Sequence, residues 1–220
     1  MPYYKFRNNN HKLKIGKIIC LARTYKKHAK EMDSDIFKEP VLFFKPSSSI
    51  IFNDETIIIP KMSKSVHHEV EMGIIIKNKC KNVSKKDAMN YVLGYLVGLD
   101  ITARDIQTEA KKKGLPWSIA KGFDTFTPIS SVILKENITN YRNLSISLKV
   151  NGKLKQNSNT KNMLFSIPEI IEYISKIMTL EKGDLILTGT PEGVNTIENG
   201  DILEANLGDI LSLKVNVKDE

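Results

Sequence analysis

Short runs of apolar or alternating residues recur along this chain, separated by polar turns or by turns that contain glycine or proline. Runs of four to nine residues with this punctuation predict β-strands. The predicted strands are residues 17–21, 41–44, 56–59, 68–76, 95–99, 145–150, 153–156, 184–187, 202–206 and 211–217. Asn151-Gly152 separates two of these runs, and this dipeptide is a strong signal for a tight β-hairpin.

Helical signals occur in four segments, residues 24–38, 85–92, 102–113 and 166–177. Thr24 is a candidate N-cap of the first segment, which we interpret as a short helix or a mobile helical lid. Ser84 begins a Ser-x-x-Asp box before the second, Gly114 ends the third, and Ser166 caps the fourth, which has a proline in its first turn. Many short strands interrupted by a few helices predict a β-rich α+β fold rather than a regular βαβ repeat.

Length and composition are those of one folded domain. The chain has 220 residues, of which 41% are hydrophobic and 26% charged, and both fractions are ordinary for globular proteins. We place an N-terminal extension at residues 1–14 and a single domain at residues 15–220. No apolar run approaches the 18 residues of a membrane span, so we expect no membrane association.

Two features of the sequence bear on the compartment. The first twenty residues lack the apolar stretch of a secretory signal and the Arg- and Ser-rich pattern of a mitochondrial presequence, so we interpret them as a mature start. The two cysteines, Cys20 and Cys80, lie outside any Cys-x-x-Cys pair, which favours a reducing environment. We expect a cytoplasmic protein, or a mitochondrial one if the source is eukaryotic.

The chain is basic. Lys and Arg total 33 against 25 Asp and Glu, which gives a net charge of +8 and raises nucleic-acid binding as a hypothesis. Only four of the 33 are Arg, the residue that recognises phosphate and guanine bidentately. Because Ile and Asn are abundant as well, we attribute the charge to compositional drift of the source genome and expect no nucleic-acid partner. A positive surface would still attract a small dicarboxylate.

A pair of carboxylates lies in the predicted strand 68–76. Glu69 and Glu71 project from one face of a strand, with their Cα atoms about 6.5–7 Å apart, and they repel each other unless a cation lies between them. Oxygen ligands favour Mg²⁺, Mn²⁺ or Ca²⁺ over zinc. The alternative is a solvated strand face, although the apolar run that follows argues for burial. His67 shares the carboxylate face and could be a ligand or a neighbour of one, whereas His68 points the other way.

Asp100 ends the apolar run 95–99 and is a candidate third carboxylate or, alternatively, the N-cap of the helix that follows. Arg104 and Gln107 are i, i+3 neighbours on that helix, so they could present hydrogen-bond donors from one face. As an alternative, both are surface residues.

Three further features could carry chemistry. His28 and Glu31 are i, i+3 neighbours on a helix, and a histidine oriented by a carboxylate is a common general base, although such a pair often occurs by accident. Lys121 lies in an Ala-Lys-Gly sequence. Residues 188–194 form a loop rich in Gly, Pro and Thr that offers hydroxyl and N–H groups to an anion, or that is a plain turn.

In their order along the chain, six segments together resemble the fumarylacetoacetate hydrolase family. They read LARTYKKHAKEM, PVLFFKPSSSI, HHEVEMGIII, GYLVGLDITARDIQ, KKKGLPWSIAKGFDTFTP and TLEKGDLILTGTPEGV. The resemblance covers residues 15–217 and is strongest to the short, single-domain branch of acylpyruvases and oxaloacetate decarboxylases. It implies a β-rich roll of mixed sheets around a central metal pocket, and a homodimer.

The resemblance also implies a site. The residues that match the family's positions are Glu69, Glu71 and Asp100 for Mg²⁺ or Mn²⁺, His28 and Glu31 for a dyad on the lid helix, Lys121 for the active-site lysine, and Arg23, Arg104, Gln107 and Thr190 for contacts with the substrate. The family's usual Gly-Arg-Asn-Tyr reads Ala22-Arg23-Thr24-Tyr25 in this sequence. This departure bears on how the substrate's carboxylate is bound and not on the metal ligands.

The activity implied is metal-dependent cleavage of the C–C bond of 3-acylpyruvates, such as acetylpyruvate or fumarylpyruvate, to pyruvate and a carboxylic acid. Decarboxylation of oxaloacetate would use the same site. A related oxo-diacid isomerase or tautomerase, or a fumarylpyruvate hydrolase, is the alternative with the same metal. A non-catalytic metal or nucleic-acid binder is a remote alternative, because binding alone needs no base of the His28–Glu31 kind.

Overall fold

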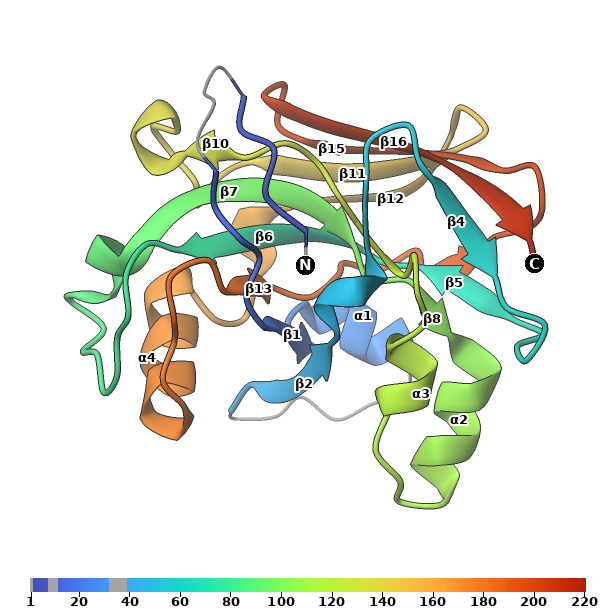
Figure 1. Cartoon of the computed structure of the whole chain (residues 1–220), viewed down its shortest axis with the longest axis horizontal. Helices are drawn as coiled ribbons and strands as arrows, with labels where there is room; N and C mark the ends of the chain where they lie inside the picture. The colour runs from blue at the N-terminus through green and yellow to red at the C-terminus, as the bar shows by residue number, and fades with distance from the viewer. Residues whose placement is uncertain (1, 8–11, 32–38) are drawn as a thin grey trace.

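The computed structural model describes residues 2–7, 12–31 and 39–220, whose strands form three sheets (Figure 1). The eight-stranded central sheet has the order β2 (Val41–Lys45), β1 (Ile18–Ala22), β13 (Leu185–Leu187), β6 (Val70–Ile76), β7 (Val92–Leu99), β9 (Thr127–Ile129) and β3 (Ile50–Phe52), and β10 (Ile133–Leu134) also pairs with β7. The five-stranded sheet has the order β12 (Lys153–Asn159), β11 (Ser145–Val150), β15 (Ile202–Leu207), β16 (Leu211–Asp219) and β4 (Thr56–Ile59). The third contains β14 (Asn195–Thr196), β5 (Val66–His68) and β8 (Thr102–Ala103).

The helices flank these sheets (Figure 1). The α-helices are α1 (Lys26–Glu31), α2 (Arg104–Lys112), α3 (Ser118–Lys121) and α4 (Ile167–Ile177), and the short 3-10 helices are η1 (Ser47–Ser49), η2 (Ala88–Tyr91), η3 (Lys135–Asn137) and η4 (Thr160–Asn162). In Figure 1, α2 and α3 lie together near one end of the central sheet, and α4 lies near the other. Among the described residues, no helix is long and apolar enough to cross a membrane.

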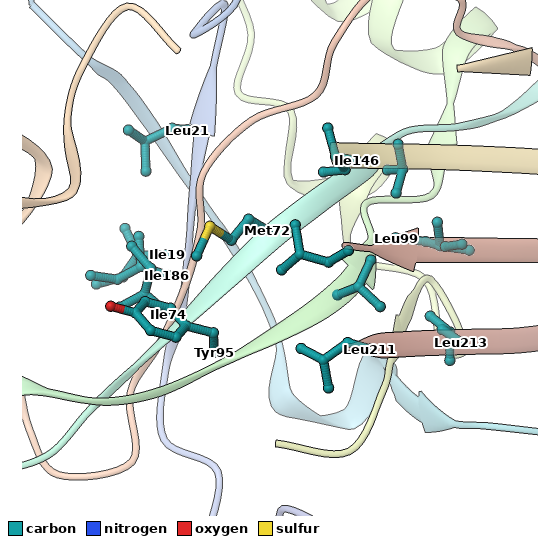
Figure 2. Close-up of a cluster of buried hydrophobic side chains, with 14 of the residues drawn as sticks. Ile19, Leu21, Met72, Ile74, Tyr95, Leu99, Ile146, Ile186, Leu211 and Leu213 are labelled. Atoms are coloured by element: carbon teal, nitrogen blue, oxygen red, sulfur yellow. The ribbon is translucent and has the colours of Figure 1, made fainter. Parts of the chain in front are cut away.

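The main core lies between the central sheet and the five-stranded sheet (Figure 2). Figure 2 shows Met72 and Tyr95 of the central sheet on one side of this core, with Ile146, Leu211 and Leu213 of the other sheet facing them. All five side chains are buried. This packing explains why the strands of the second sheet alternate between buried and exposed positions, since only one face meets the core.

The opposite face of the central sheet is also buried. Ile18 and Cys20 of β1, with Leu185 of β13, belong to a second apolar cluster that includes Tyr4 from the N-terminal segment. The Tyr4 hydroxyl donates a hydrogen bond to the Gly183 carbonyl at 3.0 Å. The described residues of the predicted extension 1–14 therefore cover the sheet, and burial on both faces explains the near-continuous apolar sequences of β1, β6 and β13.

The predicted β-rich α+β fold is confirmed, and each predicted strand overlaps an observed one. The hairpin at Asn151-Gly152 is confirmed as well: it joins β11 to β12, and both residues have the positive φ, 51° and 74°, that a type I′ turn requires. Helix α4 starts directly after Ser166, as predicted, and the Ser166 N–H and hydroxyl both donate to the Glu169 carboxylate.

Four details of the prediction are wrong. The strand predicted at 68–76 is broken at Glu69, which lies between β5 and β6. Residues 85–92 form a turn and η2 rather than an α-helix, because Val92 is needed in the buried strand β7. Thr102 belongs to β8 and pairs with His67 of β5, so α2 begins only at Arg104.

The fourth concerns the first helix. Thr24 does not cap it, since its hydroxyl donates to the Thr188 carbonyl at 2.6 Å. Helix α1 spans Lys26–Glu31, and residues 32–38 of the predicted segment lie outside the described residues.

Two glycines of β7 allow a direct test of this packing. A Cβ at Gly94 would lie 2.3 Å from the carbonyl oxygen of Ile133, whereas a Cβ at Gly98 would lie 3.3 Å from its nearest neighbours. We predict that Gly94→Ala lowers the free energy of unfolding by about 1–3 kcal/mol, because the β7–β10 pairing must open. Gly98→Ala, the matched control in the same strand, should cost clearly less. Equal losses in urea denaturation would show that the β7–β10 contact is not tight.

Candidate functional site

Three buried carboxylates meet at the junction of β5, β6 and β7. Glu69 lies between β5 and β6, Glu71 is in β6, and Asp100 follows the last residue of β7. Because β6 and β7 are antiparallel and Val70 pairs with Leu99, the start of one strand lies beside the end of the other. The three side chains offer oxygens that all lie within 4.8 Å of one another. The structure therefore brings together the three residues that the sequence analysis matched to metal ligands.

Three cations surround these carboxylates. Lys121 Nζ donates to Glu69 Oε2 at 2.9 Å, to Thr102 Oγ1 at 2.7 Å and to Asp100 Oδ2. Lys45 Nζ donates to Asp100 Oδ1 at 2.7 Å, and Arg104 pairs with Glu69. An ammonium has three donors, so those of Lys121 are all engaged with the protein.

The surroundings shift the pKa values of Glu69 and Glu71 in opposite directions. Burial raises the pKa of Glu69, but Lys121 and Arg104 outweigh it and hold that pKa well below its usual range. The pKa of Glu71 is raised well above its usual range, first by burial and then by the charges of Asp100 and Glu69. Within the described part of the chain Glu71 forms no ion pair, and its Oε2 accepts a hydrogen bond from Gly189 N at 2.7 Å. The cluster thus contains one carboxylate whose charge the protein does not compensate directly.

This donor set fits a hard divalent cation. Mg²⁺ binds carboxylate oxygens at about 2.0–2.1 Å, so oxygens on opposite sides of the ion lie about 4.2 Å apart. The observed 4.8 Å limit requires only a small inward movement. A cation would also stabilise the ionised form of Glu71 and lower its pKa, because it would offset the repulsion from its neighbours.

The predicted dyad lies on α1, and its His28 lines the same pocket as Glu69 and Glu71. His28 Nδ1 is 3.2 Å from Glu31 Oε2 on α1, and His28 is nearly fully buried. The Glu31 carboxylate also accepts from Gly193 N at 3.0 Å, so the loop after β13 holds it in place. Glu31 therefore orients the imidazole by one ring nitrogen and leaves the other for a ligand.

One pocket gathers most of the predicted site residues, although Asp100 and Glu31 are not among those that line it. Its lining includes Arg23, His28, Glu69, Glu71, Arg104, Gln107, Lys121 and Thr190, together with Phe43, Lys111 and Trp117, which the sequence analysis did not single out. Arg104 also donates to Gln107 Oε1 at 2.6 Å, so these two side chains form one unit on α2. Arg23 has a φ of +60°, a backbone region costly for a residue with a Cβ. Such strain concentrates at functional sites.

The two histidines of β5 stay outside the carboxylate cluster. His67 Nε2 lies 3.2 Å from Ser65 Oγ, and burial followed by the charge of Arg104 lowers the pKa of His67 to about 4. His68 is buried with its Nδ1 3.0 Å from Gln156 Oε1. His67 is therefore neutral near pH 7 and is not among the residues grouped around the candidate ion.

Two supporting residues were missed. Gln156 is fully buried in the otherwise polar strand β12, where it accepts from Val70 N and donates to Thr190 Oγ1 at 2.8 Å. It ties the Thr190 loop to the start of β6, and nothing in its polar sequence surroundings signals burial. Lys45 directly follows the apolar residues 41–44 and is the one buried residue of β2, so a lysine that closes an apolar run is a usable signal.

Comparisons with known proteins place this arrangement. The profile of the fumarylacetoacetate hydrolase C-terminal family matches residues 17–218. An uncharacterised protein of Pyrococcus abyssi is 51% identical over 200 residues, 91% of this chain and 89% of the relative. The mitochondrial oxaloacetate tautomerase of Bos taurus is 47% identical over 201 residues, 91% of each chain. The crystal structure of fumarylpyruvate hydrolase from Pseudomonas aeruginosa with Mn²⁺ and pyruvate superposes with a TM-score of 0.96 at 30% identity, over 100% of this chain and 96% of that one.

Divalent metal should stabilise the fold through these carboxylates. At about 100 times its Kd, Mn²⁺ or Mg²⁺ should raise the Tm by about 5–10 °C, measured by thermal denaturation after dialysis against chelator. Glu71→Gln should abolish this response, yet leave the metal-free Tm equal or higher, because the buried charge on Glu71 is unfavourable without a cation. Glu204→Gln, a control on β15, should keep the full response. A metal-independent Tm in the parent protein would contradict the metal site.

Proposed function

The chain belongs to the fumarylacetoacetate hydrolase family, and we propose that it is an enzyme that interconverts the keto and enol forms of oxaloacetate. The observation that carries this proposal is the pocket lined by Glu69, Glu71, Lys121 and His28. Asp100 completes the carboxylate cluster beside this pocket, and Glu31 orients His28. The 47% identity to a protein named oxaloacetate tautomerase, over 91% of both chains, supports the substrate.

Each group has a role in this proposal. Mg²⁺ or Mn²⁺ held by Glu69, Glu71 and Asp100 would supply electrostatic stabilisation of negative charge at the 2-oxo acid end of the substrate. His28, oriented by Glu31 through Nδ1, removes the proton from C3 of the keto form. Lys121 would give up one of its carboxylate contacts when the metal is bound, and the freed donor stabilises the negative charge that develops on the C2 oxygen. The protonated His28 then returns the proton to the C2 oxygen, which completes the enol, and the reverse steps regenerate the ketone.

The substrate contacts follow from the lining of the pocket. We assign the 2-oxo acid end to Arg23, Arg104, Gln107 and Thr190, as the family resemblance implies. Gln156 donates to the Thr190 hydroxyl oxygen, so that the hydroxyl proton is left for the substrate. We also propose a small anionic substrate, a homodimer and a cytoplasmic location, as expected from the sequence.

A second candidate is the cleavage of 3-acylpyruvates to pyruvate and a carboxylic acid, which the sequence analysis placed first. Its specific support is the close superposition on a fumarylpyruvate hydrolase bound to Mn²⁺ and pyruvate. The same dyad would activate water, and Lys121 would stabilise the pyruvate enolate that leaves. We place tautomerisation first because relatives that carry that name are more similar in sequence. Decarboxylation of oxaloacetate would use the enolate stabilisation alone.

Variants at His28 and Lys121 separate these reactions. We predict that His28→Ala lowers both tautomerisation and acylpyruvate hydrolysis by a factor of about 10²–10⁴, but lowers oxaloacetate decarboxylation much less, because loss of CO₂ needs no base. Lys121→Ala should lower all three reactions. The measurement is a panel of oxaloacetate, acetylpyruvate and fumarylpyruvate assayed with Mg²⁺ and, separately, with excess EDTA.

The control is Lys26→Ala, which changes an exposed residue of the same helix and should leave every rate unchanged. If His28→Ala lowers all activities equally, the histidine closes the pocket over substrate rather than acting as a base. No turnover of oxaloacetate by the parent protein with either metal would refute the proposed tautomerase.

A further inference from the structure

The cations that line the pocket differ in how they are paired. Lys121 and Arg104 each pair with Glu69. Lys111, which lines the same pocket, forms no ion pair with any described carboxylate, and its Nζ lies 5.3 Å from the centre of the Trp117 ring. Lys111 is therefore a pocket cation that the described protein groups do not neutralise.

Lys111 lies on the face of α2 that lines the pocket. Arg104, Gln107 and Lys111 are spaced i, i+3 and i+7, so they share one face of the helix. All three line the pocket. The Cα of Lys111 lies about 10 Å further along the helix axis than that of Arg104, at a rise of about 1.5 Å per residue. Side chains on a helix lean toward its N-terminus, which brings the Lys111 ammonium nearer to the carboxylate cluster. One end of this face thus meets the carboxylate cluster and the other reaches the pocket's exposed rim.

Two aromatic rings of the pocket lining, Phe43 and Trp117, lie between the Lys121 and Lys111 ammonium groups. The Lys121 ammonium lies 4.8 Å from the centre of the Phe43 ring, and Phe43 contacts Trp117 with ring centres 5.7 Å apart. Trp117 in turn lies under Lys111. This wall connects the ammonium at the carboxylate cluster to the ammonium at the rim and leaves the charges at its two ends.

We propose that Lys111 is a specificity-determining residue that binds the distal carboxylate of a 2-oxo diacid, whose 2-oxo acid end lies at the carboxylate cluster. The proposal rests on the proposed function and extends it to the second carboxylate of the substrate. Oxaloacetate carries that carboxylate at C4, whereas pyruvate ends in a methyl group. An anion at Lys111 is held by a charge-assisted hydrogen bond, which is stronger than a neutral one.

The electrostatic surroundings agree with an anionic ligand. The pKa of Lys111 is lowered, first by desolvation and next by the positive charges of Arg104 and Arg23. The positive charges of Arg104 and Arg23 therefore repel that of Lys111, and a carboxylate bound among the three would offset this repulsion.

The test compares a diacid with a monoacid. Dissociation constants of oxaloacetate and pyruvate are measured by titration calorimetry on the full chain loaded with Mn²⁺, and the KM of oxaloacetate and the Ki of pyruvate are measured where turnover occurs. Lys111→Met, which keeps the aliphatic stem, should weaken oxaloacetate about tenfold and change pyruvate less than twofold. Lys111→Arg should retain most of the affinity for the diacid.

Lys112→Met is the matched control, because it removes the same charge one residue away, where Lys112 pairs with Glu109 on the exposed side of α2. It should change neither ligand. Equal weakening of both ligands by Lys111→Met, or no change in either, would overturn the proposal. The failure of the proposed tautomerase is a separate outcome, since absent turnover of oxaloacetate leaves the calorimetric comparison intact.

Discussion

The burial of three carboxylates against three cations is the constraint on which the site depends. Isolated charges in a protein interior are strongly unfavourable, so each must be paired or bound to a metal. Glu69 and Asp100 are paired by Lys121, Arg104 and Lys45, whereas Glu71 relies on one backbone N–H. This imbalance is stable only in a rigid surrounding that holds like charges together. It leaves the protein ready to gain stability from a divalent cation.

The sheets provide that rigidity. The antiparallel pairing of β6 with β7 sets the start of one strand beside the end of the other, and apolar clusters on both faces hold the central sheet in place. The break at Glu69 allows its side chain to leave the strand's alternation. Helix α1, which follows β1, then brings His28 and Glu31 to the cluster, and the loop after β13 brings Thr190. Gln156 holds Thr190 in place from the second sheet. The chemistry is thus concentrated where three sheets meet.

Much of this could be predicted from the sequence, for reasons that particular residues make clear. The strands of the central sheet are predictable from continuous apolar runs, because both faces are buried, and those of the second sheet from their alternation. The hairpin at Asn151-Gly152 is predictable because few residues tolerate its φ values. Glu69, Glu71 and Asp100 stand beside apolar runs, so their burial is foreseeable. The break at Glu69 and the β8 pairing of Thr102 depend on partners distant in sequence. The roles of Gln156 and Lys111 could not be predicted, because their sequence neighbours are polar: Gln156 lies in a polar strand and Lys111 in a run of three lysines.

The most direct test of the central claim is a crystal structure of the protein soaked in Mn²⁺, with the ion located by its anomalous scattering. The account predicts one strong peak in contact with carboxylate oxygens of Glu69, Glu71 and Asp100, and a Lys121 ammonium that has given up at least one of its carboxylate contacts. An ion bound elsewhere, or an unchanged Lys121 with no peak between the three carboxylates at millimolar Mn²⁺, would contradict it.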